Sequence, residues 1–194
     1  GKTIQTISLL LHERDTLKVK TPALIVCPTS VVGNWAREFE RFAPTIKAHV
    51  HRGLERHQGE AFENTAKTHD VVLTSYPLLM RDRETLANME WGTVVLDEAQ
   101  NIKNSSAKQA QAARALKANN RIALTGTPVE NRLSELWSIM AFLNPGYLGS
   151  EESFRKNFAR PIERTADAAA TESLRRLTTP FMLRRLKTDT TISS

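Results

Sequence analysis

Short runs of apolar residues recur along the first two-thirds of the chain, and each run ends at a polar or turn-forming residue. Leu24-Ile25-Val26 runs into Cys27-Pro28, and Val71-Val72-Leu73 runs into Thr74-Ser75. Continuous apolar runs of this length are typical of strands buried on both faces, as in a parallel sheet. We therefore expect strands at 24–26, 47–51, 70–75, 93–98 and 121–124.

The segments between these runs have helical spacing. In the first of them, Ile4, Ile7, Leu10 and Leu11 recur at three- and four-residue intervals, which indicates an amphipathic helix. The expected helices span 2–13, 31–42 (with Thr29-Ser30 as its cap), 55–66, a short segment opened by Pro77, and 105–118. Strands that alternate with helices through short connections predict an α/β fold, a parallel sheet covered by helices on both faces.

The pattern changes in the last third of the chain. A helical pattern from Leu133 to Leu143 stops at Asn144-Pro145-Gly146, and beyond Gly149 only helices are expected, at 150–159 and 166–178. We place the domain boundary here, with an α/β domain over 1–149 and a C-terminal helical extension over 150–194.

Composition narrows the class of protein only slightly. The 194 residues are 40% hydrophobic and 25% charged, with a net charge of +6, which is ordinary for a globular domain and mildly favours a polyanion partner. Cys27 is the single cysteine, so an internal disulfide is excluded. No apolar run approaches the roughly 18–20 residues that span a bilayer, and we expect no membrane partner.

The run Thr93 to Gln100 ends in two adjacent acids, Asp97 and Glu98. Ligands of open α/β sheets bind at the carboxyl ends of the strands. In a nucleotide hydrolase, one such acid holds Mg²⁺ on the triphosphate and the next orients or deprotonates water. Taken alone, the run fits an acidic surface turn equally well.

Gly1-Lys2-Thr3 matches the end of a phosphate-binding loop, G-x-x-x-x-G-K-[ST]. The glycine allows close approach of phosphate, the lysine is a point charge for it, and the threonine hydroxyl is a Mg²⁺ ligand. The tripeptide opens a helix, as such a loop must, and the Asp-Glu strand follows later in the chain. Together they predict a Mg·ATP site. Because the pattern starts at its sixth position, we expect the chain to be a piece of a larger protein.

Hydroxyl groups and glycines follow three of the expected strands. The three exits are Pro28-Thr29-Ser30, Thr74-Ser75-Tyr76 and Thr125-Gly126-Thr127-Pro128. Each alone is a turn or a helix cap. Several on one sheet edge are suited to contact a nucleic-acid backbone through its phosphates.

The order of these motifs and the residues in them resemble those of the Swi/Snf family of DNA-dependent ATPases, within the second helicase superfamily. The resemblance covers nearly the whole chain. It rests on the segments Gly1–Thr6, Leu24–Phe39, Val72–Tyr76, Leu96–Asn104, Arg121–Pro128, Asn131–Pro145 and Phe181–Lys187.

This resemblance implies the first of two RecA-like lobes, a three-layer α/β fold, followed by a helical protrusion and the start of a linker to the second lobe. It implies a nucleotide site made by Gly1, Lys2, Thr3, Asp97, Glu98 and Gln100. In that site Lys2 holds phosphate, Thr3 and Asp97 hold Mg²⁺, and Glu98 activates the attacking water.

The resemblance also implies a nucleic-acid track and its coupling to ATP. Pro28, Thr29, Thr74 and Ser75 would line the DNA backbone, and Thr125, Gly126 and Thr127 would couple the two sites. Family members move along duplex DNA and remodel DNA-bound protein. Expected partners are therefore duplex DNA, a DNA-bound protein and the second lobe of the same parent chain. The expected location is the cytoplasm at the nucleoid, or the nucleus in a eukaryote.

Two positions depart from the family pattern. Gln100 stands where His is often found, and both side chains can hydrogen-bond a phosphate or the Thr125 segment. Arg132 stands where Asn is frequent, and we attach no function to it.

Two other hypotheses remain open from the sequence. The first is an RNA helicase of the Asp-Glu-x-x-box type, against which the Trp35 context and the Leu136-Trp137-Ser138 helix argue. The second is that the chain by itself is an inactive DNA- or protein-binding module, with negligible ATP hydrolysis, because most of the phosphate loop and the second lobe's arginine are not in this sequence.

Other conspicuous residues are given structural interpretations. None of the five histidines has a metal-type spacing. Trp35 and Trp137 lie among apolar neighbours and are expected in the core. Arg184, Arg185 and Lys187 fit a phosphate contact and a solvated helix end equally well.

Overall fold

The computed structural model describes residues 1–126 and 132–183. The chain divides into two compact units, Gly1–Leu148 and Gly149–Ser194. None of the described helices has both the length and the apolar character needed to cross a membrane.

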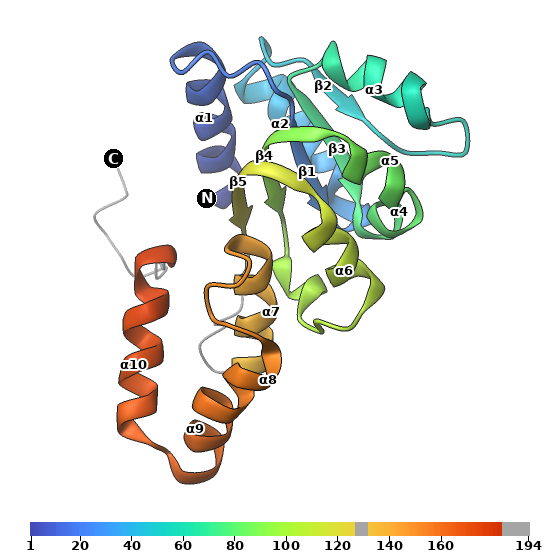
Figure 1. Ribbon diagram of the computed structural model, residues 1–194. Helices are drawn as coiled ribbons and strands as arrows, with labels where there is room; N and C mark the ends of the chain where they lie inside the picture. Colours follow the sequence, from blue (N-terminus) through green and yellow to red (C-terminus); the bar gives the residue numbers. More distant parts are fainter. Residues whose placement is uncertain (127–131, 184–194) are drawn as a thin grey trace. The chain divides into compact units, whose positions relative to one another are not determined.

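The first unit is built on one five-stranded sheet in which all paired strands are parallel (Figure 1). Its strands are β1 (Ala23–Cys27), β2 (Ala48–Val50), β3 (Val71–Ser75), β4 (Glu90–Leu96) and β5 (Lys117–Ala123), in the spatial order β2-β3-β1-β4-β5. The central strands β1 and β3 are buried along their whole length, as the continuous apolar runs predicted.

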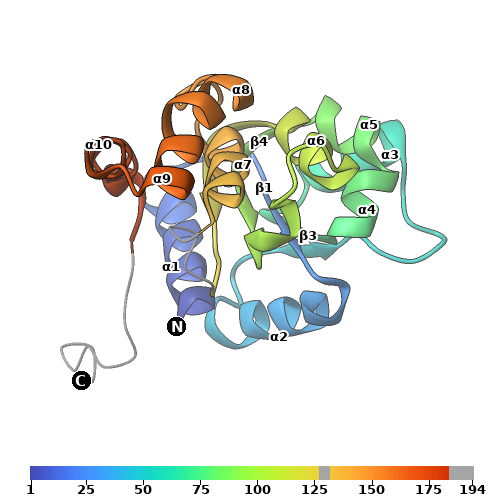
Figure 2. The same ribbon diagram turned by 90° about the horizontal axis from the view of Figure 1, so that it is seen from below.

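Helices cover both faces of this sheet (Figure 2). One face carries α1 (Lys2–Asp15) and α2 (Val32–Phe42). The other carries α3 (Gly59–Lys67), α4 (Tyr76–Arg81), α5 (Arg83–Asn88) and α6 (Lys108–Ala115), and α7 (Leu133–Leu143) packs against α6 and β5. The predicted α/β architecture, a parallel sheet between two helical layers, is confirmed.

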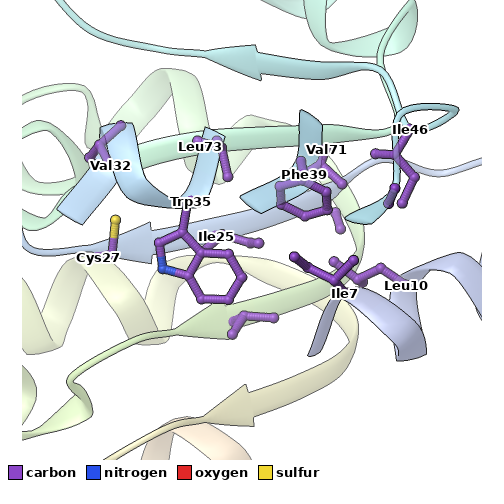
Figure 3. Close-up of a cluster of buried hydrophobic side chains, with 13 residues drawn as sticks. Ile7, Leu10, Ile25, Cys27, Val32, Trp35, Phe39, Ile46, Val71 and Leu73 are labelled. Atoms are coloured by element: carbon purple, nitrogen blue, oxygen red, sulfur yellow. The ribbon is translucent and has the colours of Figure 1, made fainter. Parts of the chain in front are cut away.

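The core between α1, α2 and the sheet is made of large apolar side chains (Figure 3). Trp35 and Phe39 of α2 are each 1% exposed, and Ile7 of α1 packs with them. Ile25 and Leu73 enter this core from the sheet, both fully buried. The strand residues in it alternate in sequence, because neighbouring side chains of a strand point to opposite faces.

Several sequence predictions are wrong in their bounds, including the helix expected at 55–66, which begins only at Gly59. The helix expected at 105–118 is only Lys108–Ala115, and Lys117 to Asn120 belong to β5. This segment is rich in helix-favouring and polar residues, but parallel pairing with β4 overrides that preference. β5 lies at the sheet edge and is only partly buried, so it lacks the apolar run of a central strand.

The strand predicted at 93–98 is displaced toward the N-terminus. β4 spans Glu90–Leu96, so Asp97 and Glu98 lie in the turn that follows it, before a short 3-10 helix, η2 (Ala99–Ile102). After β1, Thr29–Val31 form a 3-10 turn, η1, in which neither Thr29 nor Ser30 caps α2 by a side-chain hydrogen bond.

The second unit, as far as it is described, is helical. It comprises α8 (Glu151–Phe154), a π-helical turn η4 (Arg155–Ala159), α9 (Arg160–Thr165), α10 (Ala168–Thr178) and η5 (Thr179–Phe181). Side-chain caps begin two of these helices: Ser150 accepts from the Ser153 N–H at 3.1 Å and Asp167 from the Ala170 N–H at 2.9 Å. Ala166, at φ 50°, ends α9.

Candidate functional site

The parallel register brings the strand exits to one edge of the sheet. Cys27 lies opposite Ser75, Val26 opposite Leu96, and Leu96 opposite Ala123. The residues that follow β1, β3, β4 and β5 therefore share the carboxyl edge, where ligands of open α/β sheets bind.

Asp97 is held at this edge by donors on both of its carboxylate oxygens. Its Oδ2 accepts from the indole Nε1–H of Trp35 at 2.9 Å, and its Oδ1 accepts from the backbone N–H of Glu98 at 2.9 Å. Its backbone carbonyl accepts from the Tyr76 hydroxyl at 2.6 Å. Burial raises the pKa of Tyr76, which keeps that hydroxyl protonated as a donor. The Asp97 carboxylate is thus fixed in direction.

Glu98 has an unusual backbone conformation, φ 49° and ψ 55°, in the left-handed region. That region is uncommon for residues other than glycine and recurs at functional sites. The Glu98 carbonyl accepts from the Asn101 side-chain amide at 2.8 Å. This local bond stabilises the turn that follows β4.

A chain of side-chain hydrogen bonds runs from the β4 exit to the β5 exit. The Gln100 amide donates to Glu98 Oε2 at 2.7 Å, and the Thr125 hydroxyl donates to Gln100 Oε1 at 3.1 Å. A backbone bond from the Ala99 N–H to the Leu124 carbonyl, 2.8 Å, runs alongside it. Gln100 therefore bonds both Glu98 and Thr125 at the same time.

The N-terminus of α1 lies at the same exit. Gly1 is the N-cap residue, and no side-chain cap bonds the first turn within the described chain. First-turn N–H groups have no intrahelical partners, so such an end binds anions. The ammonium of Lys2 is 3.9 Å from where a Cβ on Gly126 would stand. Lys2 is exposed and Thr3 half-buried.

The donors present at this edge fit Mg²⁺ held together with a nucleotide. Among the residues that the structure describes, no group of three or more His, Cys, Asp or Glu side chains is placed to hold a metal. Mg²⁺ does not require such a cage, because it binds through one or two protein ligands, substrate phosphates and water. The fixed Asp97 carboxylate and the Thr3 hydroxyl offer oxygen atoms of the kind that Mg²⁺ binds.

A groove lies on the β1–β3 side of the same edge, with a cavity volume of about 380 Å³. Thr29 and Ser75, two of the residues predicted to face a nucleic-acid backbone, line it. Thr74 does not line it, because its side chain is fully buried and its hydroxyl donates to the His51 carbonyl at 3.3 Å. Pro28, half-buried, is the residue before η1.

Three arginines that line this groove were missed in the sequence. Arg52 and Arg81 are exposed and line it beside Thr29 and Ser75, while Arg56 is half-buried. Arg52 directly follows the strand predicted at 47–51, so its place at a strand exit was a usable signal. Arg81 ends a short helix, and no pattern marked it. A groove with hydroxyls and exposed cationic side chains suits a polyanion.

A buried ionic cluster supports the wall of this groove. Asp82, with a side chain 4% exposed, accepts from Arg56 Nη2 at 2.7 Å and from Arg56 Nε at 2.5 Å, and contacts His51 Nε2 at 2.8 Å. Burial alone would raise the pKa of Asp82, but hydrogen bonds from Arg56, His51 and Gln58 outweigh it and lower the pKa to about 2. Burial lowers the pKa of His51, so its imidazole is neutral at pH 7 and donates to Asp82.

Replacing Asp82 by asparagine should lower the free energy of unfolding of the first unit by about 2 kcal/mol at pH 7. This figure follows from the pKa of Asp82, which is lowered from 3.8 to about 2 on folding. Because the folded pKa is below the unfolded one, this stabilisation is present above pH 3.8 and is lost as the pH falls toward 2. Urea unfolding followed by tryptophan fluorescence at pH 7 and pH 3 measures it.

Asp15→Asn is the matched control, because Asp15 also pairs with an arginine, Arg14, at 2.7 Å but has a 56% exposed side chain. We expect little change from it. Equal effects of the two variants, or a loss for Asp82→Asn that does not shrink in acid, would contradict this interpretation of the cluster.

The other residues singled out in the sequence lie outside the described residues or in buried and half-buried positions. Thr127, Arg184, Arg185 and Lys187 lie outside the described residues. Trp35 is in the core, as predicted, and Trp137 is half-buried on α7. Burial raises the pKa of Cys27 to about 12, so this buried thiol stays protonated.

Known proteins resemble the chain over nearly its whole length. The family model for the SNF2-related domain matches residues 1–193. YwqA of Bacillus subtilis (strain 168), named as a candidate ATP-dependent helicase/translocase, is 50% identical over 97% of this chain. The TATA-binding protein-associated factor MOT1 of Saccharomyces cerevisiae is 39% identical, also over 97% of the chain.

A solved structure agrees with the fold. The SWI2/SNF2 ATPase core of Sulfolobus solfataricus in complex with dsDNA superposes with a TM-score of 0.87 at 44% identity, covering 97% of this chain and 38% of that one. The chain spans 20% of YwqA and 11% of MOT1, so it corresponds to one part of these longer proteins.

The matched family model, the identity to these relatives and the shared α/β core confirm the family that the motifs indicated. The chain belongs to the SNF2-related family and forms a RecA-like ATPase lobe of the Swi/Snf type in the second helicase superfamily.

Proposed function

We propose that the protein containing this chain is an ATP-driven translocase on duplex DNA that remodels DNA-bound protein. In this proposal the chain supplies one wall of the Mg·ATP site and part of the DNA track. The observation that carries it is the connected set at the carboxyl edge. The ammonium of Lys2 approaches Gly126, the neighbouring Thr125 bonds Gln100, and Gln100 bonds Glu98.

The nucleotide site follows from what each group can do. The N-terminus of α1 and the Lys2 ammonium bind the phosphates as anions. Thr3 and Asp97 would hold Mg²⁺, which when bound neutralises negative charge on the phosphates. Asp97 cannot rotate freely, because Trp35 and the Glu98 N–H hold its two oxygens. It therefore presents its remaining lone pairs in one direction.

Glu98 is the proposed base for the attacking water. Its Oε2 already accepts a hydrogen bond from Gln100 at 2.7 Å, which orients the carboxylate and leaves Oε1 to accept a proton from water. The Glu98 side chain bonds Gln100, whereas the Asp97 carboxylate bonds Trp35 and the Glu98 N–H. These separate contacts support different roles for the two neighbouring acids.

Gln100 and Thr125 are the proposed coupling elements. The Glu98–Gln100–Thr125 bonds join the water-activating acid to the β5 exit. A displacement of Thr125 and the adjoining Gly126 would change the orientation of Glu98 through these bonds. DNA-dependent hydrolysis needs such a link between the nucleotide site and the track.

The DNA track is proposed to run along the groove lined by Thr29, Ser75, Arg52 and Arg81. The similar Sulfolobus ATPase core was solved in complex with dsDNA, which supports duplex DNA as the partner. Hydroxyls and arginines contact phosphate oxygens without reading base sequence, as translocation along any sequence requires. Such a protein would act at the nucleoid, or in the nucleus of a eukaryote.

The Arg52→Ala/Arg81→Ala double variant of the full-length protein should bind duplex DNA more weakly at every sequence. Each lost phosphate contact reduces the slope of log K against log salt by about 0.9, so the slope should become shallower by roughly 2. Fluorescence anisotropy over a range of salt concentrations measures both quantities.

The control for this test is the Lys20→Ala/Lys67→Ala double variant. It removes the same charge from a cavity beside Pro22 and Glu90, where β1 and β4 begin. We expect its salt slope to match the wild type. Equal slopes in all three proteins would exclude the groove as the track.

ATP turnover is proposed to need the second lobe of the parent chain. In related phosphoryl-transfer enzymes an arginine supplied from outside the phosphate loop contributes on the order of 10³–10⁵ in rate. We therefore expect the 194-residue chain alone to turn over ATP far more slowly than the full-length protein does.

A further inference from the structure

Trp35 makes a polar contact that its place in the core does not require. Its side chain is 1% exposed, and its indole ring packs among Ile25, Phe39 and the other apolar residues between α2 and the sheet (Figure 3). The indole nitrogen nevertheless donates to Asp97 Oδ2 at 2.9 Å, across 62 positions of sequence. A phenylalanine would fill most of this volume without reaching Asp97.

This hydrogen bond supplies one of the two fixed points of the Asp97 carboxylate. The other is the Glu98 N–H on Oδ1, which belongs to the same turn as Asp97 and moves with it. Trp35 belongs to a different element, α2, and its ring is held in place by the packing of the core. It is therefore the contact that ties the direction of the carboxylate to the rigid core.

The two hydrogen bonds to the Asp97 carboxylate leave lone pairs on both oxygens that a metal can use. Each carboxylate oxygen has two lone-pair sites, and the bonds from Trp35 and Glu98 occupy one on each oxygen. The remaining sites can accept other ligands. Groups that hydrogen-bond a metal ligand typically change metal affinity or activity by 10–100-fold when removed.

We propose that Trp35 is a positioning residue for the metal site, holding the Asp97 carboxylate in the direction in which it binds Mg²⁺ with the nucleotide. The inference rests on the proposed role of Asp97. It adds that a donor from the hydrophobic core, outside the acidic motif itself, sets the affinity of the site for its metal.

The test uses the full-length protein with Trp35→Phe. In the presence of a non-hydrolysable ATP analogue, the affinity for Mn²⁺ measured by electron paramagnetic resonance should fall by about 10–100-fold. DNA-stimulated ATPase should show a matching rise in the Mg²⁺ concentration that gives half-maximal rate. An unchanged Mn²⁺ affinity in a folded variant would overturn the proposal.

The chain provides a closely matched control in Trp91→Phe. Trp91 is also 1% exposed and also donates from Nε1 at 2.9 Å, but to the Leu86 backbone carbonyl. Both variants lose the same ring volume and one indole N–H bond, to a carboxylate for Trp35 and to a neutral carbonyl for Trp91. Bonds to charged acceptors are the stronger kind, so we expect a fall in melting temperature for both variants, with a difference no larger than that of one hydrogen bond. Only Trp35→Phe should lose Mn²⁺ affinity, and equal losses in both variants would show a general structural effect.

Two further variants keep the test decisive. Should Trp35→Phe fail to fold, 3-(3-benzothienyl)alanine at position 35 keeps the ring shape and replaces the N–H by sulfur, and the same loss of Mn²⁺ affinity is expected. Asp97→Asn separates the role of Trp35 from that of Asp97. If it leaves Mn²⁺ affinity unchanged, the proposed metal role of Asp97 fails. If only Asp97→Asn weakens binding, the role of Trp35 alone fails.

Discussion

Replacing Glu98 by glutamine is expected to lower the DNA-stimulated ATP turnover of the full-length protein by about 10²–10⁴-fold, the usual contribution of a general base. Glutamine keeps the size of the side chain, and its amide oxygen can still accept the bond from Gln100. It cannot take a proton from water. Nucleotide affinity should therefore change little while kcat falls, because the lost interaction acts in the transition state.

Glu90→Gln is the control for this result. Glu90 lies at the exposed beginning of β4, the strand that Glu98 follows, six positions before Leu96 at the carboxyl edge. The substitution is chemically identical and should leave steady-state turnover unchanged. Wild-type turnover in Glu98→Gln would end the assignment of Glu98 as the base.

Replacing Lys2 by alanine is expected to lower kcat by about 10²–10³-fold, the usual cost of removing one preorganised charge from a transition state. The Lys2 ammonium lies at the β5 exit near Gly126. There it can stabilise the negative charge that develops on the terminal phosphate in the transition state. In contrast to Glu98→Gln, this variant should also bind nucleotide more weakly, because the ground-state phosphates lose a cationic partner. Titration with a fluorescent ATP analogue separates the two effects.

Lys108→Ala is the matched control, since Lys108 is likewise an exposed lysine at the first position of a helix, α6. It should change neither nucleotide affinity nor turnover. Parallel behaviour of the two lysine variants would mean that Lys2 contributes only general helix-end charge.

The sheet could be predicted because its central strands are buried on both faces. β1 and β3 have continuous apolar runs, since neither face meets water. β5 could not be predicted over its full length. At the edge, parallel pairing with β4 holds Lys117 and Asn120 in a strand, although lysine and asparagine are more typical of helices and loops.

The site was predictable where it depends on strand exits. Thr29, Ser75 and Asp97 reach one edge because the sheet is parallel. Thr74 does not join them, because side chains alternate between the two faces of a strand and its hydroxyl is buried against His51. An apolar run shows where a strand lies, but it does not show which of two adjacent polar residues at the end of the strand faces the groove.

The groove arginines and the Trp35 contact depend on tertiary structure. Arg52 and Arg81 are 29 positions apart, and only the folding of β2, β3 and α4 brings them to one groove. For Trp35, the apolar neighbours correctly predicted burial. A buried indole N–H needs an acceptor, but the sequence does not indicate that the acceptor is Asp97.

The most direct test of the proposed function is the ATP turnover of the full-length protein without nucleic acid, with duplex DNA and with RNA. We expect a strong increase with duplex DNA, little increase with RNA, and no DNA-dependent increase in Glu98→Gln. Stimulation by RNA equal to or greater than that by duplex DNA would contradict a duplex-DNA translocase, and would favour an RNA helicase instead.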